Sequence, residues 1–223
     1  MLYLYHSEAG IPQLTLSGDE HRYIFKVRRH RTDDTLYLRN LKDGLLYRYT
    51  ITFIDKRSAT LTLQESSTLE VKASKPLHIG WCIIDPKSIE KVLPSLNEMG
   101  VEKITFIYCK RSQKSFKPDF KRLEKILLNS SQQSGRSVMM QLGIADSLEG
   151  FLTEYPKAKM LNFSEKNFIS EQNRIDTIVI GCEGGFHEEE VALFSSENIV
   201  GFDTPLILKS ESAACAVASK LLL

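Results

Sequence analysis

The stretch TIVIGCEGGFHEEEVALF, residues 177–194, decides the fold of the C-terminal part of this chain. An apolar segment runs into a glycine-rich turn, and the turn runs into three glutamates. This order is typical of a parallel strand whose carboxyl end leads into a helix, where open α/β sheets bind ligands. A plain connecting loop also commonly carries glycine, so Gly184 and Gly185 alone favour a simple connection.

The composition of the turn narrows the choice of ligand. A phosphate cradle usually needs a lysine, whereas Glu183 stands in the centre of this turn and no basic residue does. The glycines also miss the dinucleotide pattern Gly-x-Gly-x-x-Gly. A ligand with positive character, such as the sulfonium and amino group of S-adenosylmethionine, suits an acidic turn better. The glutamates at 188–190 are interpreted as helix-start residues, which the helix dipole favours.

Strands and helices alternate around this stretch. Apolar runs predict strands over residues 77–85, 104–109, 158–163 and 176–181. The 3.6-residue period predicts helices over 87–100 and 119–135, with two more from about His187 and Ser212. Gly100 occupies a C-capping position, and Pro94 predicts either a kink or a late helix start. The fold class is therefore α/β, a mainly parallel sheet with helices on both faces.

The first part of the chain has a different pattern. Segments rich in Tyr, Thr, Ile and Leu over 34–40, 45–55 and 59–65 predict an antiparallel meander, and 17–31 reads as a short basic helix or turn. A charged segment with several serines follows the meander. The predicted domains are thus 1–72 and 73–223.

Composition restricts the class of protein. The 223 residues are 42% hydrophobic, but no run approaches the roughly 18 apolar residues that span a bilayer. The start, MLYLYHSEAG, lacks the features of a signal peptide, so we expect a cytoplasmic protein without a membrane partner. The four cysteines are far apart and form no Cys-x-x-Cys pair. They predict reduced, buried thiols and neither a metal site nor a disulfide framework.

The net charge of +1 conceals an asymmetry. Residues 1–140 carry 23 Lys and Arg against 15 Asp and Glu, a charge of +8, and residues 141–223 carry 6 against 13, a charge of −7. The excess of positive charge indicates contact with a polyanion through the first part of the chain, although solvated lysines are common on any surface.

Two further loops resemble the first in position. In FDTPLILKSESAACAVASKLLL, residues 202–223, the backbone groups of the apolar segment 205–208 can bracket a flat ring, and Ser210 or Ser212 is placed to cap the following helix. In LNFSEKN, residues 161–167, a polar turn again follows a strand. Three such loops at successive strand ends can line one pocket.

Several motifs together resemble a known family. IGCEGGF at 180–186 resembles Ile-Gly-Pro-Glu-Gly-Gly-Phe of the RsmE-type rRNA uridine methyltransferases of the SPOUT superfamily, and LILKSESAA resembles their Ile-Leu-Arg-Thr-Glu-Thr-Ala. HRYIFKVRRHR, LNEMGVEKITFIYCKRS and SSQQSGR match further family elements in order. The resemblance covers nearly the whole chain. The sequence departs from the family pattern at Cys182, Thr204, Leu206 and Lys209, which stand where proline, glycine, arginine and arginine are usual.

The resemblance implies both architecture and activity. The family has a small N-terminal PUA-like β-barrel and a methyltransferase domain with a deep trefoil knot, and it works as a homodimer. S-adenosylmethionine is held by the knot loops near the subunit interface, and the methyl acceptor is N3 of a uridine in the decoding region of small-subunit (16S) rRNA. We therefore expect a methyltransferase of ribosome biogenesis that acts on 16S rRNA, within the small subunit, and needs no metal.

Site residues follow from the motifs. The cofactor-binding residues are expected to be Leu161, Ser164, Gly181, Glu183, Gly184, Gly185, Leu206, Ile207 and Leu208. The catalytic candidates are Lys209, Arg136 and Arg111, as cations beside a developing negative oxygen, and Glu211, which either orients that cation or caps the helix. The RNA-binding candidates are His21, Arg22, Arg28, Arg29 and Arg31, with a second patch of Lys110, Arg111, Lys114, Lys117, Lys121 and Arg122.

Two alternatives stay open. One is a SPOUT methyltransferase that acts on another rRNA or tRNA nucleotide. The other is an inactive RNA-binding or assembly protein of the same fold, which the four departures make worth testing.

Overall fold

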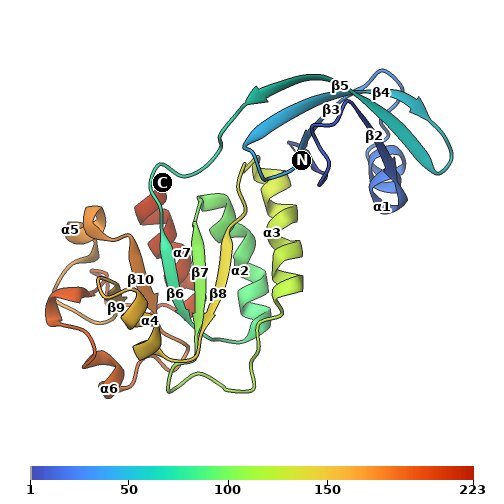
Figure 1. Cartoon of the computed structure of the whole chain (residues 1–223). Coiled ribbons are helices and arrows are strands. Elements are labelled where there is room, and N and C mark those ends of the chain that lie inside the picture. Colours follow the sequence, from blue (N-terminus) through green and yellow to red (C-terminus); the bar gives the residue numbers. More distant parts are fainter. Residues whose placement is uncertain (1) are drawn as a thin grey trace. The chain divides into compact units, whose positions relative to one another are not determined.

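The computed structural model of the chain describes residues 2–223, and these form two compact units (Figure 1). The N-terminal unit contains the residues up to Lys72 together with Ser131–Met139. The C-terminal unit contains Ala73–Ser130 and Met140–Leu223. Ser131–Met139, which lies within the predicted second domain, is thus grouped with the N-terminal unit.

The N-terminal unit is built on a curled five-stranded sheet with the strand order β1-β3-β4-β5-β2. Its strands are β1 (Leu4–Tyr5), β2 (Gln13–Ser17), β3 (Thr35–Arg39), β4 (Leu45–Ile54) and β5 (Ser58–Thr68). The predicted meander is confirmed, because β3, β4 and β5 pair in antiparallel order with tight turns between them. Register shifts between Arg48 and Tyr49 and between Ile51 and Phe53 interrupt the pairing of β4 with β5, and such bulges bend a strand.

Alternating side chains of this sheet form one core. Leu36, Leu38, Tyr49 and Ile51 all point inward and are buried. The basic segment before the meander forms the short helix α1 (Gly18–His21), which continues into the π-helix η1 (Arg22–Val27), and η1 adds Ile24 to the core. Burial of one apolar face leaves the arginines of this segment on the solvent side.

The C-terminal unit contains a six-stranded sheet with the order β11-β9-β10-β6-β7-β8, in which every pair is parallel. Its strands are β6 (His78–Cys82), β7 (Lys103–Ile107), β8 (Gln141–Ala145), β9 (Lys159–Leu161), β10 (Thr177–Ile180) and β11 (Ile199–Val200). Every residue of the central strand β6 is buried, as expected for a strand covered on both faces.

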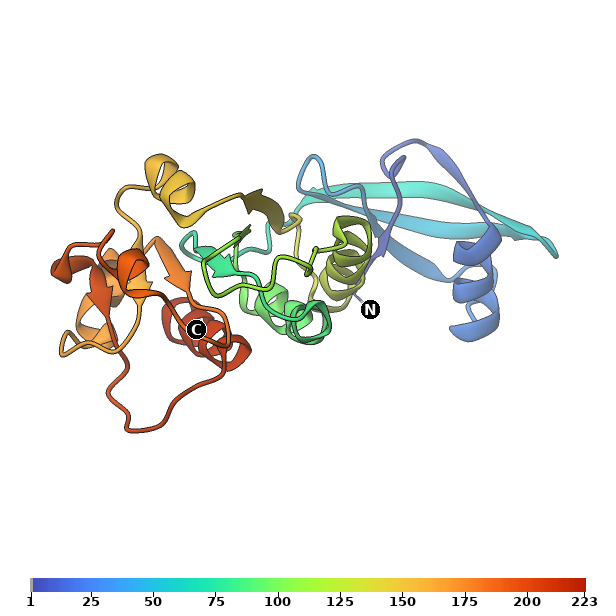
Figure 2. The ribbon, with the colours of Figure 1, turned by 90° about the horizontal axis from the view of Figure 1, so that it is seen from below.

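Helices cover this sheet on two sides. The α-helices are α2 (Pro86–Met99), α3 (Phe120–Ser134), α4 (Leu148–Glu154), α5 (Phe168–Glu171), α6 (Glu188–Val191) and α7 (Ser210–Leu222), and two 3₁₀ turns are η2 (Gln172–Arg174) and η3 (Ser196–Asn198). The helices α2 and α7 lie on one face of the sheet and α4 lies on the other (Figure 2). The predicted parallel sheet with helices on both faces is therefore confirmed. Within residues 2–223, no helix combines the length and apolar character that a membrane crossing demands.

The helix α2 shows how local chemistry sets its ends. It begins at Pro86, a position where the missing backbone N–H of proline costs nothing. It ends at Gly100, whose φ of 98° is the left-handed conformation that glycine adopts without strain. The predicted capping glycine is confirmed, whereas a late start forced by Pro94 is wrong, because the helix runs continuously through that residue.

One prediction about the cysteines is wrong. Cys82 and Cys109 form a disulfide, with their Cα atoms 5.7 Å apart. The pairing register explains it, since Cys82 lies opposite Ile107 on β7, and two more residues bring the chain to Cys109. A separation of 27 residues carries no spacing signal in the sequence. Cys182 and Cys215 are free thiols, as predicted.

Candidate active site

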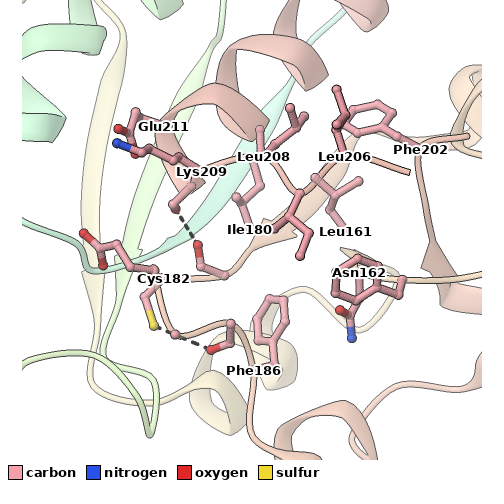
Figure 3. A pocket seen from close by; sticks show the side chains of 18 of the residues that line it. Leu161, Asn162, Ile180, Cys182, Phe186, Phe202, Leu206, Leu208, Lys209 and Glu211 are labelled. Atoms are coloured by element: carbon pink, nitrogen blue, oxygen red, sulfur yellow. Dashed lines mark hydrogen bonds between the residues drawn. The ribbon is translucent and has the colours of Figure 1, made fainter. Parts of the chain in front are cut away.

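A cavity of about 1010 Å³ opens beside the ends of β9 and β10 and the start of α7 (Figure 3). Its lining comes mainly from the three loops that sequence had singled out, residues 161–165, 180–186 and 202–211. Leu161, Ile180 and Leu206 gather on one side of the cavity, and Lys209 and Glu211 lie together on another (Figure 3). The volume is at the upper end of the range that small ligands and cofactors occupy.

The glycine loop after β10 is a tight turn. Gly185 has a φ of 68°, and its N–H donates to the carbonyl of Cys182 at 2.9 Å. A Cβ at Gly181 would come within 3.2 Å of the ring of Phe186, which also lines the cavity. The positive φ favours glycine at position 185, and a Cβ at position 181 would crowd Phe186. The turn forms one wall of the cavity.

Cys182 replaces the proline that is usual in this motif. Its thiol is buried and donates to the carbonyl of Gly185 at 3.5 Å. Burial raises the pKa of this thiol, so it remains protonated and available as a donor at neutral pH. The cysteine thus supports the turn by a side-chain hydrogen bond instead of by a rigid ring.

The loop before α7 exposes an apolar segment to the cavity mouth. Leu206 and Ile207 are 71% and 81% exposed, and Leu208 is 39% exposed. Large apolar side chains left this open are typical of a ligand or partner contact. Lys209 occupies the N-cap position of α7, and no side chain caps this helix.

Ser210 does not cap α7 as one of our predictions had it. Its hydroxyl is buried, donates to the carbonyl of Gly181 and accepts a hydrogen bond from Nε1 of Trp81 at 2.8 Å. This single side chain thereby joins α7, the glycine loop and β6. Ser212 is exposed, and the helix starts two residues earlier than predicted.

The loop after β9 contributes both apolar and polar groups. Leu161 ends the strand, and Phe163 beside it is 79% exposed. The hydroxyl of Ser164 donates to the carbonyl of Ile199 at 3.0 Å and accepts from the N–H of Lys166 at 3.1 Å. Ser164 therefore lines the cavity while its hydroxyl holds the loop together.

Three acidic residues, Glu165, Glu183 and Glu211, line the cavity beside these apolar groups. Glu183 belongs to the glycine loop and accepts from the N–H of Asp85 at 3.4 Å, and Glu211 lies in the first turn of α7. Lys209 lies near Glu211 (Figure 3). The wall thus offers carboxylates for a positively charged ligand and one ammonium group.

A second layer lies behind the glycine loop. The turn that follows β7 brings Arg111 against Gly184, and Nη1 of Arg111 donates to the Gly184 carbonyl at 2.6 Å. Arg111 is not among the residues that line the cavity, so it contacts the wall from behind. Lys110 forms an ion pair with Glu189 on the same side.

The three glutamates after the loop differ in burial and in hydrogen-bond partners. His187 and Glu190 form a capping box at the start of α6, which confirms the helix-start interpretation. Glu190, however, is 2% exposed and also accepts from the N–H of Lys110 at 2.8 Å. Helix-start chemistry alone is therefore an incomplete account of Glu190.

Two predicted site residues, Arg136 and His21, are buried and do not line the cavity. Arg136 is buried in the N-terminal unit, where its Nε donates to the Val138 carbonyl at 2.9 Å, and it does not line the cavity. His21 is buried at 6% exposure, with its Nε2 at 3.1 Å from the Asp55 carbonyl and its ring against Phe25. Phosphate contact by His21 is wrong for this structure, because its ring is packed between these groups.

The remaining RNA-binding candidates have exposed side chains. These residues are Arg22, Arg28, Arg29, Arg31, Lys110, Lys114, Lys117, Lys121 and Arg122. Arg28 is held by Tyr23, because its Nε donates to the tyrosine hydroxyl at 3.0 Å and its guanidinium lies 5.4 Å from the ring centre. The lining residues that sequence reasoning missed include Asn162, Phe163, Phe186 and Phe202. Asn162, Phe163 and Phe202 come just after β9 or β11, and that position is the signal that could have found them.

Among residues 2–223, no group of three or more His, Cys, Asp or Glu side chains is arranged to hold a metal ion.

Comparison with known proteins identifies the family. Residues 71–222 match the RNA methyltransferase domain and residues 16–64 match the RNA methyltransferase PUA domain. Ribosomal RNA small subunit methyltransferase E from Helicobacter pylori (strain ATCC 700392 / 26695) is 39% identical over 222 residues, which cover 98% of each chain. The cavity and the fold around it are thus those of an RNA methyltransferase with a PUA domain.

Solved structures show the same fold. A methyltransferase from Legionella pneumophila, in complex with the cofactor SAM, is 24% identical with a TM-score of 0.82 and covers 99% of this chain and 96% of its own. A ribosomal RNA small subunit methyltransferase E from Neisseria gonorrhoeae, bound to S-adenosyl methionine, is 19% identical with a TM-score of 0.79 and covers 98% and 95%. The chain belongs to the ribosomal RNA small subunit methyltransferase E family, as its motifs had indicated.

Proposed function

We propose that this protein transfers the methyl group of S-adenosylmethionine to N3 of a uridine in the decoding region of 16S rRNA. The name of the Helicobacter pylori relative supports a small-subunit rRNA substrate. The observation that carries the proposal is the cavity formed by three strand-end loops, in a chain of which 98% aligns with this relative. The choice of N3 as the target atom and of the decoding region as its place in the rRNA rests on the motif resemblance.

The cavity residues fit the methyl donor chemically. The adenine ring needs a flat apolar slot, and Leu161, Ile180, Leu206 and Leu208 line one side of the cavity. The sulfonium and the amino group are positive, and the carboxylates of Glu165, Glu183 and Glu211 belong to the same lining. We assign donor binding to the residues predicted from sequence that line this cavity: Leu161, Ser164, Gly181, Glu183, Gly184, Gly185, Leu206, Ile207 and Leu208.

The chemistry asks the protein to activate a weak nucleophile. When bound, S-adenosylmethionine supplies an electrophilic methyl group, but N3 of uracil is protonated at neutral pH. The chain must therefore favour the uridinate, either with a cation near the developing negative oxygen or with a base near N3–H. N3 also lies on the Watson–Crick edge, so the target uridine has to be unpaired and turned out of its stack.

Lys209 is the cation best placed for this role. Its ammonium group is the one in the cavity lining, and Glu211 beside it can orient that group. Lysine keeps the charge of the arginine that is usual in the family but lacks its planar fork. Arg111 contacts the Gly184 carbonyl from outside the cavity lining. A catalytic role for Arg136, which does not line the cavity, stays a prediction.

The proposal extends to the assembly. We propose a cytoplasmic homodimer that acts within the small ribosomal subunit, carries the family's trefoil knot and requires no metal ion. The exposed apolar side chains of Leu206 and Ile207 beside the cavity are consistent with a subunit contact there. Phosphate contacts would come from the exposed basic residues of the N-terminal unit and from those around Lys110 and Lys114.

Two measurements test the activity. Calorimetry with S-adenosylmethionine should detect binding at one site in each chain, and a protein that fails to bind it would leave the inactive RNA-binding alternative. Methyl groups should then be mapped on the rRNA of a strain that lacks the gene. Loss of one N3-methyluridine in 16S rRNA is expected, whereas loss at another nucleotide would favour a SPOUT methyltransferase with a different target.

The roles of Lys209 and Glu211 have a test of their own. Lys209→Ala and Glu211→Ala should each lower the turnover number by at least about tenfold, with a smaller effect on the Kd for S-adenosylmethionine, because a charge that acts on the transition state affects kcat. Single-turnover methylation and calorimetry on the same preparations would separate the two quantities. Equal losses of turnover and donor affinity would mean that these residues only hold the loop.

A further inference from the structure

The turn at 109–112, which follows β7, is attached to the glycine loop and the start of α6. Nη1 of Arg111 donates to the Gly184 carbonyl at 2.6 Å. The N–H of Lys110 donates to Oε1 of Glu190 at 2.8 Å, and its ammonium group pairs with Glu189. Ser112 closes the turn, because its hydroxyl accepts from the N–H of Cys109 at 3.3 Å. Two segments that are about 75 residues apart in sequence are thereby joined beside the cavity.

Glu190 is the buried member of this attachment. It is 2% exposed, whereas Glu188 and Glu189 are open to solvent. Its two oxygens serve two different segments, since Oε1 accepts from Lys110 and Oε2 accepts from the N–H of His187 at 2.8 Å. Hydrogen bonds from backbone N–H groups to a carboxylate are charge-assisted and stronger than bonds between neutral groups. One carboxylate therefore sets the spacing between the turn and the helix start.

The position of Arg111 depends on this spacing. Arg111 follows Lys110 directly, and its Cβ and Cδ lie 3.4 Å from the place where Gly184 would carry a Cβ. Arg111 is exposed, so few other contacts hold its stem in place. A shift of the Lys110 backbone would withdraw the guanidinium from the Gly184 carbonyl, and Gly184 lines the cavity. The physical connection runs from Glu190 through Lys110 and Arg111 to the cavity wall.

We propose that Glu190 is a positioning residue for methyl transfer. It holds the turn at 109–112 so that Arg111 keeps Gly184, and with it the glycine loop, in the geometry that binds the methyl donor. The proposal rests on the proposed function, since it concerns binding of S-adenosylmethionine to the same cavity. A role confined to helix capping would leave Arg111 and Gly184 unaffected by any change at Glu190.

The test uses Glu190→Gln in the full-length protein. Glutamine keeps the size of the side chain but turns one acceptor oxygen into an NH₂ group that faces a backbone N–H. The Kd for S-adenosylmethionine measured by calorimetry should rise about tenfold, the effect of losing one charge-assisted hydrogen bond. KM for the donor should rise with it, while kcat at saturating donor should stay within about twofold, as for lost ground-state binding. Glu188→Gln is the matched control, because it removes the same charge from the exposed side of the same helix turn.

A double-mutant cycle with Arg111→Met decides whether Glu190 acts through Arg111. Methionine retains much of the apolar stem and loses the donor, so this variant alone should also weaken donor binding. Adding Glu190→Gln to Arg111→Met should then cause little further loss, since the connection is already broken. Fully additive losses, or a Glu190→Gln protein that binds the donor as the wild type does, would overturn the proposal.

Thermal unfolding of the variants and donor binding by the wild type separate a failure of this proposal from a failure to fold or a failure of the proposed function. If Glu190→Gln does not fold, as judged by its thermal unfolding, Arg111→Met carries the test alone, and wild-type donor binding by that variant would overturn the proposal. If the wild-type protein itself binds no S-adenosylmethionine, the proposed function fails. If the wild type binds and methylates while both variants match it, only the role of Glu190 fails.

Discussion

Ser210 joins three elements of the candidate site through one hydroxyl group. It donates to the Gly181 carbonyl, accepts from Nε1 of Trp81, and stands in the first turn of α7. The hydroxyl is buried, so water cannot replace these hydrogen bonds. The preference of serine for helix starts suggested a cap here, and the tertiary contacts determine a different partner.

We expect Ser210→Ala to destabilise the protein and the cavity together. The free energy of unfolding should fall by about 1–3 kcal/mol, because the indole N–H of Trp81 and the Gly181 carbonyl lose a buried partner. Urea denaturation at constant pH would measure the loss. Ser212→Ala, in the same helix turn but exposed, should change it by no more than about 0.5 kcal/mol. If the two variants have the same free energy of unfolding, the hydroxyl of Ser210 makes no net contribution to stability.

At the scale of elements, strongly periodic segments were predictable and weakly patterned ones were not. The strands β6 and β10 are apolar runs, and α2 has a clear 3.6-residue period with a capping glycine, so local sequence identifies them. We missed β8, an edge strand with Gly143 inside it and two exposed residues, and also the short helix α4. An edge strand buries little, so its sequence carries little hydrophobic pattern.

The candidate site also has a part that could be predicted from sequence and a part that could not. The three loops were predictable, because each follows or precedes an element with a strong pattern and parallel strands bring such loops to one edge. The contacts behind them were not predictable, since Glu190 with Lys110, Ser210 with Trp81 and the disulfide of Cys82 all join residues far apart in sequence. Only the order of strands in the sheet decides which of these residues meet, and single-sequence patterns do not encode that order.

Charge is the property of the whole molecule that bears most directly on its substrate. The positive excess lies in residues 1–140, and the loops of the candidate site lie in the acidic remainder. This division suits a protein that binds a polyanion with one part of its chain and a positively charged methyl donor with another. Each basic side chain that contacts a phosphate releases counterions, so such contacts appear in the salt dependence of RNA affinity.

Arg28 and Arg29 allow this property to be tested with single charges. Arg28 is held by Tyr23, and Arg29 adopts a φ of 62°, so both side chains project from a defined backbone turn. Arg28→Glu and Arg29→Glu should each reduce the slope of log K against log salt by about 1, the contribution of one phosphate contact. Arg28→Glu should cost more affinity, because its guanidinium is already ordered in the free protein.

The measurement is filter binding of a 16S rRNA fragment over a series of KCl concentrations. Lys157→Glu is the matched control, since it makes the same change of charge at an exposed turn in the acidic remainder of the chain. Its slope should equal that of the wild type. If all three variants lower the affinity and the slope equally, binding would depend on net charge alone, and the segment of η1 would have no specific place on the RNA.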